Sequence, residues 1–438
     1  MAERHLFGTD GVRGLANSEL TPATAFGLAR AAGESRSGHV VIGRDTRRSG
    51  PMLAAALMAG FNSVGVDVVD VGIIPVGGVS VLTRDTGAEF GVMVSASHNP
   101  APDNGIKFFD ADGTKLSDEH EAAIESRYFR GEPWVGPVGP DVGKQTVMTD
   151  AVDRYVDVLA RGLGSGISGP DVVVDTANGA AFLAAPELFR RIGASAEFVN
   201  TIPDGMNINR DCGATHPEAV AERSAGRVGL AFDGDADRLI AVDEDGRIAN
   251  GDVIMAIFAA WMQERGELAH ETVVVTVMSN LGFHKAMERL GINVIETRVG
   301  DRYVLEAMRS SQAVVGGEQS GHVLLEDRAT GDGLRSALRL MEVMAGTGKE
   351  LRELRTIMDE YPQVLNNVRV AGNKSFDDND AIVGAIRDGE RTLAGRGRIL
   401  VRASGTEPLI RVMVEAPSEN EAGDVAAAIA GVVQSELG

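Results

Sequence analysis

Short apolar runs along this chain alternate with longer segments in which apolar residues recur at helical spacing. The first full example has an apolar strand at 39–43, a helix at 52–61 and a second strand at 65–69. Strand, turn, helix, glycine and strand is the pattern of a βαβ unit, in which a right-handed crossover joins two parallel strands. The pattern therefore predicts a parallel sheet near the N-terminus.

The same pattern occurs twice more. The second copy has a strand at 171–175, a helix at 181–192 and a strand at 193–199, and the third has them at 271–275, 283–290 and 291–295. Each copy is followed by another short apolar strand, at 91–94, 228–232 and 313–316, that ends in a polar loop. Three copies predict three related α/β domains whose polar loops meet in a common cleft.

Beyond Tyr361-Pro362 the pattern changes. Strands are expected at 368–370, 398–401 and 409–414, with helices at 378–388 and from Ser418 onward, which is typical of a smaller α+β domain. The predicted architecture is α/β, with three related α/β/α domains and a C-terminal α+β domain around a central cleft. The predicted boundaries are 1–150, 151–249, 250–362 and 363–438.

Composition narrows the class of partner. The 438 residues include 63 acidic and 42 basic side chains, for a net charge of −21. This balance argues against a nucleic-acid or anionic-membrane partner, because either would favour a basic face. A single cysteine, Cys212, excludes internal disulfides and fits a reducing cytoplasm. The chain opens without an apolar signal core, and the longest apolar stretch, 253–262, is too short to span a bilayer.

The loop that follows the strand at 91–94 holds the first candidate for chemistry. Ligands of parallel sheets gather beyond the carboxyl ends of the strands, so Ser97 is the candidate reactive hydroxyl. Asn104-Gly105 predicts a tight turn, after which a returning strand carries Lys107 back over the serine. Its ammonium would stabilise phosphate charge or assist proton transfer. For His98, a structural role in the loop is at least as strong as a role in proton transfer.

The second loop holds three alternating carboxylates, Asp233, Asp235 and Asp237. An extended loop points all three to one side, where they repel one another unless a cation lies between them, and hard oxygen ligands suit Mg²⁺. An EF-hand is excluded because Arg238 stands where that loop needs glycine. A solvated acidic turn is the plain alternative to a metal site.

Two further loops and the N-terminal segment supply polar groups. Glu318 and Ser320 are suited to hydrogen bonding with sugar hydroxyls and His322 to proton transfer, although a capped glycine loop would explain these residues nearly as well. The anion-binding parts of the last domain are Arg402, Ser404, Gly405, Thr406 and Arg411. The alternative is a hairpin in which Arg402 pairs with Glu407. Near the N-terminus, glycines spaced every third residue allow close approach to a ligand, with Arg13 projecting from them.

Four of these loops, taken in order, resemble the signature loops of the α-D-phosphohexomutases. They are Ser95-Ala96-Ser97-His98-Asn99-Pro100, Asp233-Gly234-Asp235-Ala236-Asp237-Arg238, Gly317-Glu318-Gln319-Ser320-Gly321-His322 and Arg402-Ala403-Ser404-Gly405-Thr406. The opening Phe7-Gly8-Thr9-Asp10-Gly11-Val12-Arg13-Gly14 and the ending Ser404-Gly405-Thr406-Glu407-Pro408 are similar to the bacterial phosphoglucosamine mutase branch. The resemblance spans essentially the whole chain.

The resemblance implies a role for each matched residue. It makes Ser97 the phosphoserine and lets its phosphate hold one Mg²⁺ together with the three aspartates. It surrounds the transferring phosphoryl group with Arg13, Lys107 and Arg238, and leaves Lys107 and His322 as candidates for the general acid and base. It assigns sugar hydroxyls to Glu318 and Ser320, and the non-reacting phosphate to Arg402, Ser404, Gly405, Thr406 and Arg411.

The implied reaction interconverts glucosamine 6-phosphate and glucosamine 1-phosphate through glucosamine 1,6-bisphosphate, and so supplies UDP-N-acetylglucosamine and cell-wall precursors. A sugar bisphosphate would serve as activator, the location would be cytoplasmic and the resemblance suggests a homodimer. Three alternatives stay open: a glucose or mannose phosphomutase of the same family, a catalytically silent phosphosugar-binding protein and a Mg²⁺-dependent phosphatase. Turning the intermediate over also predicts that the fourth domain moves relative to the other three.

Overall fold

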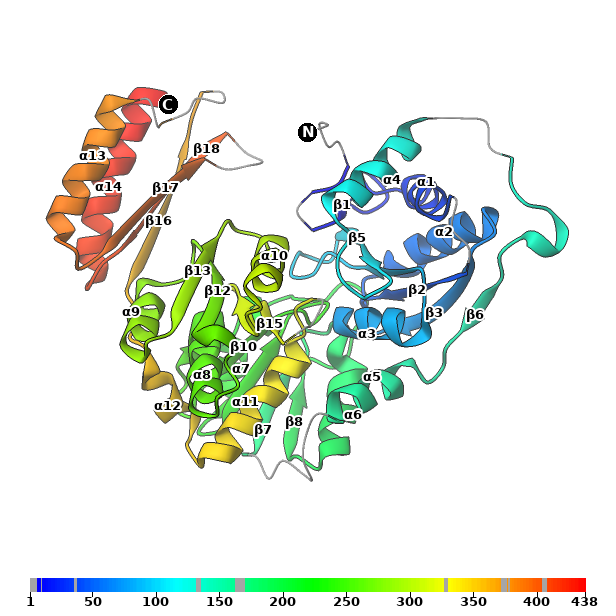
Figure 1. Ribbon diagram of the computed structural model, residues 1–438, viewed down its shortest axis with the longest axis horizontal. Helices are drawn as coiled ribbons and strands as arrows, with labels where there is room; N and C mark the ends of the chain where they lie inside the picture. The colour runs from blue at the N-terminus through cyan, green and yellow to red at the C-terminus, as the bar shows by residue number, and fades with distance from the viewer. Residues whose placement is uncertain are drawn as a thin grey trace. The chain divides into compact units, whose positions relative to one another are not determined.

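The fold is known from a computed structural model that describes residues 6–8, 10–34, 38–130, 135–161, 170–326, 330–371, 376, 379–403 and 408–438. These residues form four sheets in two compact units (Figure 1). We call Met1–Met278 with Ile292–Thr356 the large unit, and Ser279–Gly291 with Ile357–Gly438 the small unit.

The first sheet of the large unit has the strand order β1-β5-β4-β2-β3-β6. Its strands are β1 (Val12–Leu15), β2 (His39–Arg44), β3 (Asp67–Ile73), β4 (Phe90–Val94), β5 (Asp103–Asp110) and β6 (Gln145–Val147). Its helices are α1 (Pro22–Gly33), α2 (Gly50–Ser63), α3 (Val76–Thr86) and α4 (Asp118–Arg130). β2 pairs in parallel with both β3 and β4, as the sequence predicts, whereas β5 runs antiparallel to β4 and β1.

Successive side chains along the strands of this sheet point to opposite faces, and each face is covered by a layer of helices. Val40 and Ile42 of β2 and Val92 and Val94 of β4 pack into one buried cluster with residues of α1, α2 and α4. The helix α3 covers the opposite face (Figure 1). Because both faces are covered, β2 and β4 are apolar at nearly every position, and this continuous apolar run is the pattern that predicts a buried strand.

The second sheet has the order β11-β10-β9-β7-β8. Its strands are β7 (Val172–Asp175), β8 (Ala196–Val199), β9 (Val228–Phe232), β10 (Leu239–Val242) and β11 (Ile248–Ala249), and the associated helices are α5 (Ala151–Ala160), α6 (Ala181–Ile192) and α7 (Glu218–Ser224). β7 pairs in parallel with β8 and β9, so the second predicted βαβ unit is confirmed. Cys212 lies in a buried loop, and burial raises the pKa of its thiol to about 12, which fits a packing role.

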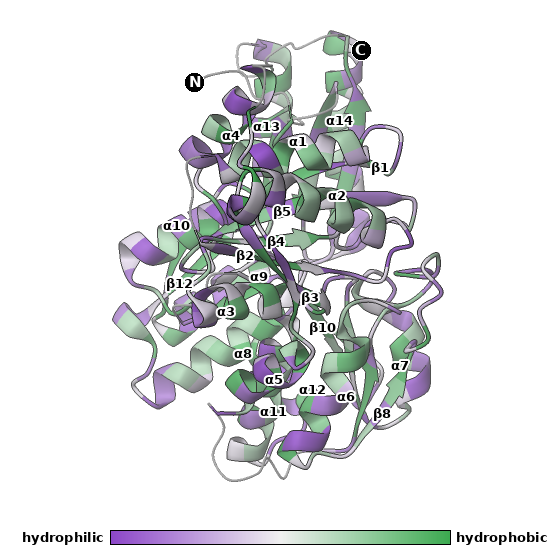
Figure 2. Cartoon of the chain, turned by 90° about the vertical axis from the view of Figure 1, so that its right-hand side faces the viewer, coloured by the Kyte–Doolittle hydropathy of each residue, from purple (hydrophilic) through white to green (hydrophobic). Residues whose placement is uncertain are grey.

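The third sheet has the order β13-β12-β14-β15 and completes the large unit. Its strands are β12 (Thr272–Thr276), β13 (Asn293–Thr297), β14 (Val315–Gly317) and β15 (Val323–Leu325), and its helices are α8 (Gly251–Glu264), α10 (Asp301–Ser311), α11 (Gly333–Thr347) and α12 (Leu351–Leu354). The apolar stretch 253–262 is the buried part of α8, which is coloured mainly as hydrophobic in Figure 2. Among the helices that the structure describes, none combines the length and apolar character needed to cross a membrane.

The small unit has the antiparallel sheet β16-β18-β17. Its elements are β16 (Gln363–Arg369), β17 (Arg398–Ala403), β18 (Leu409–Glu415), α13 (Asp380–Leu393), α14 (Glu419–Leu437) and α9 (Leu281–Leu290). An antiparallel sheet with two long helices is what the sequence predicts for an α+β domain, and the predicted fold class is confirmed. The start of α9 joins this unit through the side chain of Asn280, which accepts from the Tyr361 amide at 2.9 Å and donates to its carbonyl.

The structure contradicts one local prediction. Asn104 and Gly105 do not form a turn but lie within β5, where they pair with Gly14 and Arg13 of β1. Glycine is needed there because a side chain would meet the chain itself: a Cβ on Gly105 would lie 2.4 Å from the carbonyl oxygen of Ser95. The predicted consequence nevertheless holds, since β5 returns alongside β4 and carries Lys107 back beside Met93.

Candidate active site

Ser97 lies just beyond the end of β4, in a loop that the fold holds tightly. Its side chain is buried, and its hydroxyl donates a hydrogen bond of 2.6 Å to Oδ2 of Asp233 in the second repeat. Its backbone has φ of +51°, a left-handed conformation that is uncommon for residues other than glycine. Such conformations persist where surrounding contacts impose them, and they are frequent at functional sites.

Three aspartates meet at the carboxyl end of β9. Asp233, Asp235 and Asp237 are buried, and each offers a carboxylate oxygen within 4.8 Å of the others. Burial and the two neighbouring carboxylates raise the pKa of Asp233 well above its ordinary value, which shows how strongly the cluster resists a third negative charge. Oδ1 of Asp235 and of Asp237 is buried and has no hydrogen-bond partner in the part of the chain that the structure describes. These residues fit a small divalent cation, which would take up both the charge and the unpaired oxygens.

Lys107 brings a positive charge to the same cluster. Its ammonium lies 3.0 Å from Asp235, 3.4 Å from Asp237 and 3.0 Å from Asp10. Burial disfavours a charged ammonium, but the three carboxylates outweigh it and raise the pKa of Lys107 above the usual lysine value. Lys107 is therefore a fixed cation at the aspartate cluster that Ser97 also contacts, which favours charge stabilisation over proton transfer as its role.

Sequence reasoning missed three charged residues of the site, namely Asp10, Lys115 and Asp301. Asp10 accepts from Lys107 and forms short ion pairs with Arg13 and Lys115, and Lys115 forms another short ion pair with Asp301. Burial would raise the pKa of Asp10, but the three cations hold it well below its ordinary value. Asp10 could have been found, since it stands beside Arg13 in the glycine-rich opening. No nearby sequence pattern marks Asp301 as a site residue, because only the fold brings the start of α10 close to Lys115.

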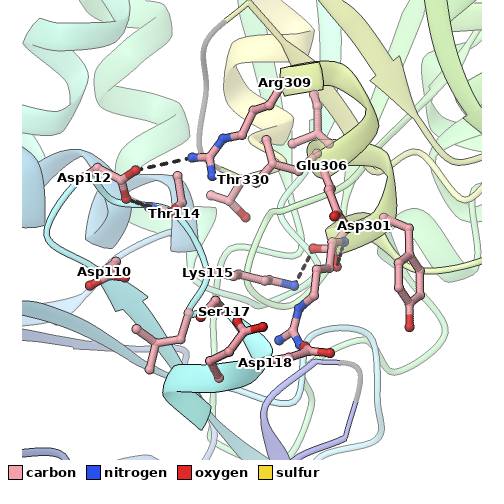
Figure 3. Close-up of a pocket in the computed structure, with 16 residues that line it drawn as sticks. Asp110, Asp112, Thr114, Lys115, Ser117, Asp118, Asp301, Glu306, Arg309 and Thr330 are labelled. Atoms are coloured by element: carbon pink, nitrogen blue, oxygen red, sulfur yellow. Dashed lines mark hydrogen bonds and ion pairs between the residues drawn. The ribbon is translucent and has the colours of Figure 1, made fainter. Parts of the chain in front are cut away.

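Lys115 and Asp301 also form one wall of a pocket (Figure 3). The pocket has a volume of about 400 Å³ and is lined by the segment 110–119 and by the first turns of α10. A second ion pair, Arg309 with Asp112 at 3.3 Å, crosses from α10 to the same segment. Opposite charges thus join the first repeat to the third on the side of the site where Asp301 lies.

Arg13 and Arg238 approach the serine loop from two sides. Arg13 donates to the carbonyl of Ala96 and to Oδ1 of Asn99, each at 3.3 Å. The backbone amide of Arg238 donates to Oδ1 of Asp233 at 3.2 Å, and the side-chain Nε of Arg238 lies 3.8 Å from Oδ1 of Asp237. Arg238 Nε is buried and makes no hydrogen bond within the described ranges, so this guanidinium keeps an N–H for an anion.

Two histidines lie near the site in different ionisation states. Burial, followed by Arg238 and Arg13, lowers the pKa of His98 to about 4, so this ring is neutral at pH 7. For His322 the carboxylate of Asp237, 3.5 Å from Nδ1, overcomes burial and raises the pKa to about 9. The amide of Gly331 points at Nε2 of His322 from 3.2 Å and favours the neutral tautomer with the proton on Nδ1. Opposing contacts of this kind suit a group that gains and loses a proton.

The third loop presents Glu318 and Ser320 beside β14. Oε1 of Glu318 accepts from the amide of Gly300 at 3.0 Å, immediately before α10 begins. The hydroxyl oxygen of Ser320 is buried and makes no hydrogen bond to any residue that the structure describes. A carboxylate held by one oxygen and an unpaired hydroxyl are the groups that a sugar hydroxyl would need.

The predicted phosphate-binding loop lies in the small unit. Arg402 of β17 and Arg411 of β18 are direct partners across the antiparallel pair, so their side chains share one face. Burial and the charge of Arg411 lower the pKa of Arg402, because two positive charges lie close together. Ser404, Gly405 and Thr406 lie outside the described residues, so their predicted part stays a prediction.

Four domain families match the chain in order. They are the phosphoglucomutase/phosphomannomutase α/β/α domain I at residues 4–133, domain II at 153–246, domain III at 250–361 and the C-terminal domain at 365–432. Together they cover most of the 438 residues.

Curated relatives match over nearly their whole length. A phosphoglucosamine mutase of Moorella thermoacetica is 52% identical over 434 residues, covering 97% of this chain and 98% of that protein. A phosphoglucosamine mutase of Symbiobacterium thermophilum is 51% identical over 444 residues, covering 99% of both.

Solved structures share the fold at lower identity. A phosphoglucomutase/phosphomannomutase family protein from Burkholderia thailandensis has a TM-score of 0.80 at 24% identity, with 98% of this chain and 97% of that chain covered. An N-acetylphosphoglucosamine mutase from Aspergillus fumigatus, in complex with GlcNAc-6P and magnesium, has a TM-score of 0.68 at 20% identity, with 99% and 96% covered.

Proposed function

This chain belongs to the phosphoglucomutase/phosphomannomutase family, and we propose that it interconverts glucosamine 6-phosphate and glucosamine 1-phosphate through a phosphoserine at Ser97. Full-length relatives of about half identical sequence support the substrate. One observation carries the chemistry: the hydroxyl of Ser97 contacts a buried carboxylate of a three-aspartate cluster, beside a buried lysine. This arrangement suits phosphoryl transfer, which depends mainly on positioning and charge neutralisation.

The proposed cofactor is one Mg²⁺ per chain. Asp233, Asp235 and Asp237 would hold it, together with an oxygen of the Ser97 phosphate, and the unpaired carboxylate oxygens support this assignment. When bound, the ion would neutralise charge on the phosphoryl group. Carboxylate and phosphate oxygens are the ligands that Mg²⁺ prefers, which favours it over softer metals.

In the proposed mechanism, the phosphoryl group leaves Oγ of Ser97 for O1 of glucosamine 6-phosphate and gives glucosamine 1,6-bisphosphate. The bisphosphate turns around, its 6-phosphoryl group returns to Ser97, and glucosamine 1-phosphate is released. Lys107, Arg13 and Arg238 surround the group in transit and spread its negative charge over three cations. The sugar oxygen that attacks must lose a proton and Oγ of Ser97 must gain one. His322, which Asp237 holds protonated at pH 7, is the candidate to give Oγ its proton and then to take up the proton that the sugar oxygen releases.

The remaining contacts select and orient the sugar. Glu318 and Ser320 would bind ring hydroxyls, and Arg402, Ser404, Gly405, Thr406 and Arg411 would bind the phosphate that does not react. The cross-strand pairing of Arg402 and Arg411 supports this assignment, since two guanidinium groups on one face can bind the oxygens of one phosphate. A homodimer, a cytoplasmic location and activation by a sugar bisphosphate stay predictions.

A coupled assay for glucosamine 1-phosphate, run beside intact-mass analysis, tests this function. The protein treated with glucose 1,6-bisphosphate should carry one phosphate, lose it on mixing with substrate and form the isomer. Ser97→Ala should carry none, and its turnover should fall to background. Turnover by the Ser97→Ala protein at the parent rate would overturn the nucleophile assignment.

The same assay separates the alternatives. Release of inorganic phosphate instead of the isomer would indicate a phosphatase, and a stable phosphoserine without turnover would indicate a binding protein. Comparing kcat/KM for the 6-phosphates of glucosamine, glucose and mannose distinguishes the sugars. We expect glucosamine 6-phosphate to give the highest value, and a higher value for either of the others would contradict the substrate assignment.

A further inference from the structure

Arg47 is among the most completely buried large side chains of the protein, although arginine is rarely buried without a reason. It follows β2, in the loop that leads to α2, and its guanidinium is wholly inaccessible to solvent. Neither its position in the sequence nor the proposed chemistry accounts for it.

All five N–H groups of this guanidinium are used, and four of them point into the Ser97 loop. Nε of Arg47 donates to Oδ2 of Asp45 at 2.8 Å, and the two side chains form a buried ion pair. The terminal nitrogens donate to backbone carbonyls on both sides of the loop, namely those of Ser97 at 2.9 Å, Asn99 at 2.8 Å, Asp103 at 3.0 Å and Pro100. Four carbonyl oxygens that converge in a buried space would repel one another without such a donor.

The partner of Arg47 is linked to the same serine from the other side. Oδ2 of Asp45 accepts from the hydroxyl of Ser95 at 2.7 Å, and that hydroxyl in turn accepts from the amide of Ser97 at 2.8 Å. The carbonyl of Ser97 is thus held by Arg47, and its amide is held through Ser95 by Asp45, the ion-pair partner of Arg47. Asn209, from the second repeat, adds a side-chain donor to the carbonyls of Ser97 at 2.9 Å and Asn99 at 3.1 Å.

We propose that Arg47 is a positioning residue for the phosphoserine: it draws the carbonyls of the loop inward and so fixes the left-handed backbone of Ser97 that aims Oγ at the aspartate cluster. The inference rests on the proposed function of Ser97. Only a planar guanidinium supplies five donors in a fixed fork, whereas the single nitrogen of lysine has three donors at one point and cannot reach four carbonyls. The positive charge also offsets the carbonyl dipoles beneath a site that must accept a phosphate dianion.

The test compares Arg47→Lys with Arg44→Lys, a matched change three residues earlier, where the arginine is partly exposed and pairs with Asp70. Both proteins are assayed well below their melting temperatures, with glucosamine 6-phosphate as substrate and glucose 1,6-bisphosphate as activator. For Arg47→Lys we expect kcat to fall roughly 10- to 100-fold, as for a misplaced reacting group, with KM within about twofold of the parent. Arg44→Lys should keep both constants. A kcat within twofold of the parent for a folded Arg47→Lys protein would overturn the proposal.

Two further measurements separate positioning from a general loss of structure. Single-turnover decay of phosphorylated Ser97, followed by intact mass, should slow in Arg47→Lys by the same factor as kcat. If Arg47→Lys does not fold, the test uses Asn209→Ala, which removes a side-chain donor from two of the same carbonyls. Its kcat should fall roughly fivefold, the effect of one hydrogen bond. An unchanged kcat in Asn209→Ala would overturn the proposal. Failure of the parent itself to form glucosamine 1-phosphate would instead overturn the proposed function.

Discussion

At the scale of single residues, the site works with charges that are buried and yet paired. Lys107 is 2% exposed and is surrounded by carboxylates, and Arg47 has no exposed atom of its guanidinium and is surrounded by carbonyls. Burial of unpaired charges is costly, so the partners that surround each of these groups offset the cost of burying its charge. The exception is the aspartate cluster, where Asp235 and Asp237 both contact Lys107 and one oxygen of each makes no hydrogen bond among the described residues.

The excess of buried negative charge at the three aspartates predicts that Mg²⁺ stabilises the folded protein. A cation that binds the native state alone adds about 2.7 kcal/mol at 100 times its dissociation constant, so Tm should rise with added Mg²⁺ and fall again with EDTA. In Asp235→Asn the rise should be largely lost, whereas Asp153→Asn, an exposed change on α5, should keep it. Thermal unfolding with and without Mg²⁺ measures this. An equal rise in Asp235→Asn and in the parent would contradict a metal site at the aspartates.

At the scale of elements, the sequence predicts the strands that deliver the site, and the reason is physical. β4, β9 and β14 are buried at every position, so each is a continuous apolar run that ends in a polar loop. Ser97 and Asp233 were found because they follow β4 and β9 directly. Lys115, Asp301 and Arg47 have no such signal, because the role of each depends on contacts with distant segments that a single sequence does not display.

Helix α8 provides an element-scale test of the sugar loop. It begins at Gly251, where a Cβ would lie 2.1 Å from the carbonyl oxygen of Glu318 and 2.7 Å from the amide of Gly321. Gly251→Ala must therefore displace the loop that carries Glu318 and Ser320, and we expect kcat/KM for glucosamine 6-phosphate to fall roughly tenfold or more.

A glycine of another helix is the control for this change. Gly346 lies in the last turns of α11, and a Cβ there would meet nothing closer than 3.8 Å. Gly346→Ala should leave kcat/KM unchanged and stabilise the protein by roughly 0.5–1 kcal/mol, because alanine has less freedom to lose on forming a helix. An unchanged kcat/KM in Gly251→Ala would show that the sugar loop does not depend on this contact.

The end of β18 predicts a pH dependence of stability within the small unit. Oε2 of Glu415, which is buried, accepts from Arg398 at 2.9 Å and from the amide of Leu281 at 3.1 Å. Burial raises the pKa of Glu415 above its ordinary value, although Arg398 opposes the shift. The folded state therefore holds this proton more firmly than the unfolded state does, so the parent loses stability as the pH rises from the ordinary glutamate pKa through the raised one.

Glu415→Gln removes this titration. The stability of the variant relative to the parent should increase as the pH rises through that interval and should level off above it. Denaturant unfolding at a series of pH values, starting just below the ordinary carboxyl pKa, gives the difference directly. A difference that is constant with pH would contradict a raised pKa at Glu415.

At the scale of the whole molecule, the chain divides its proposed chemistry between two units. The groups proposed to transfer the phosphoryl group all lie in the large unit, whereas Arg402 and Arg411 lie in the small unit. The sequence predicts a separate C-terminal domain from the change of pattern after Pro362. It does not reveal that α9, a helix of the third repeat, packs with that domain, because the contacts of Asn280 with Tyr361 join residues that are far apart in the chain.

This division predicts movement during turnover. A bisphosphate that turns around must exchange its two phosphates between the reacting group and the two arginines, so the contacts made by the small unit must loosen and form again in each cycle. We expect glucose 1,6-bisphosphate to change the small-angle scattering of the Mg²⁺-loaded protein, since the residues proposed to bind its two phosphates belong to different units. Arg411→Ala should bind the bisphosphate more weakly and need a higher concentration for the same change. Identical scattering curves with and without saturating bisphosphate would contradict the movement. If Arg411→Ala and the unsubstituted protein needed the same bisphosphate concentration for the change, that result would contradict the role of Arg411 in binding the second phosphate.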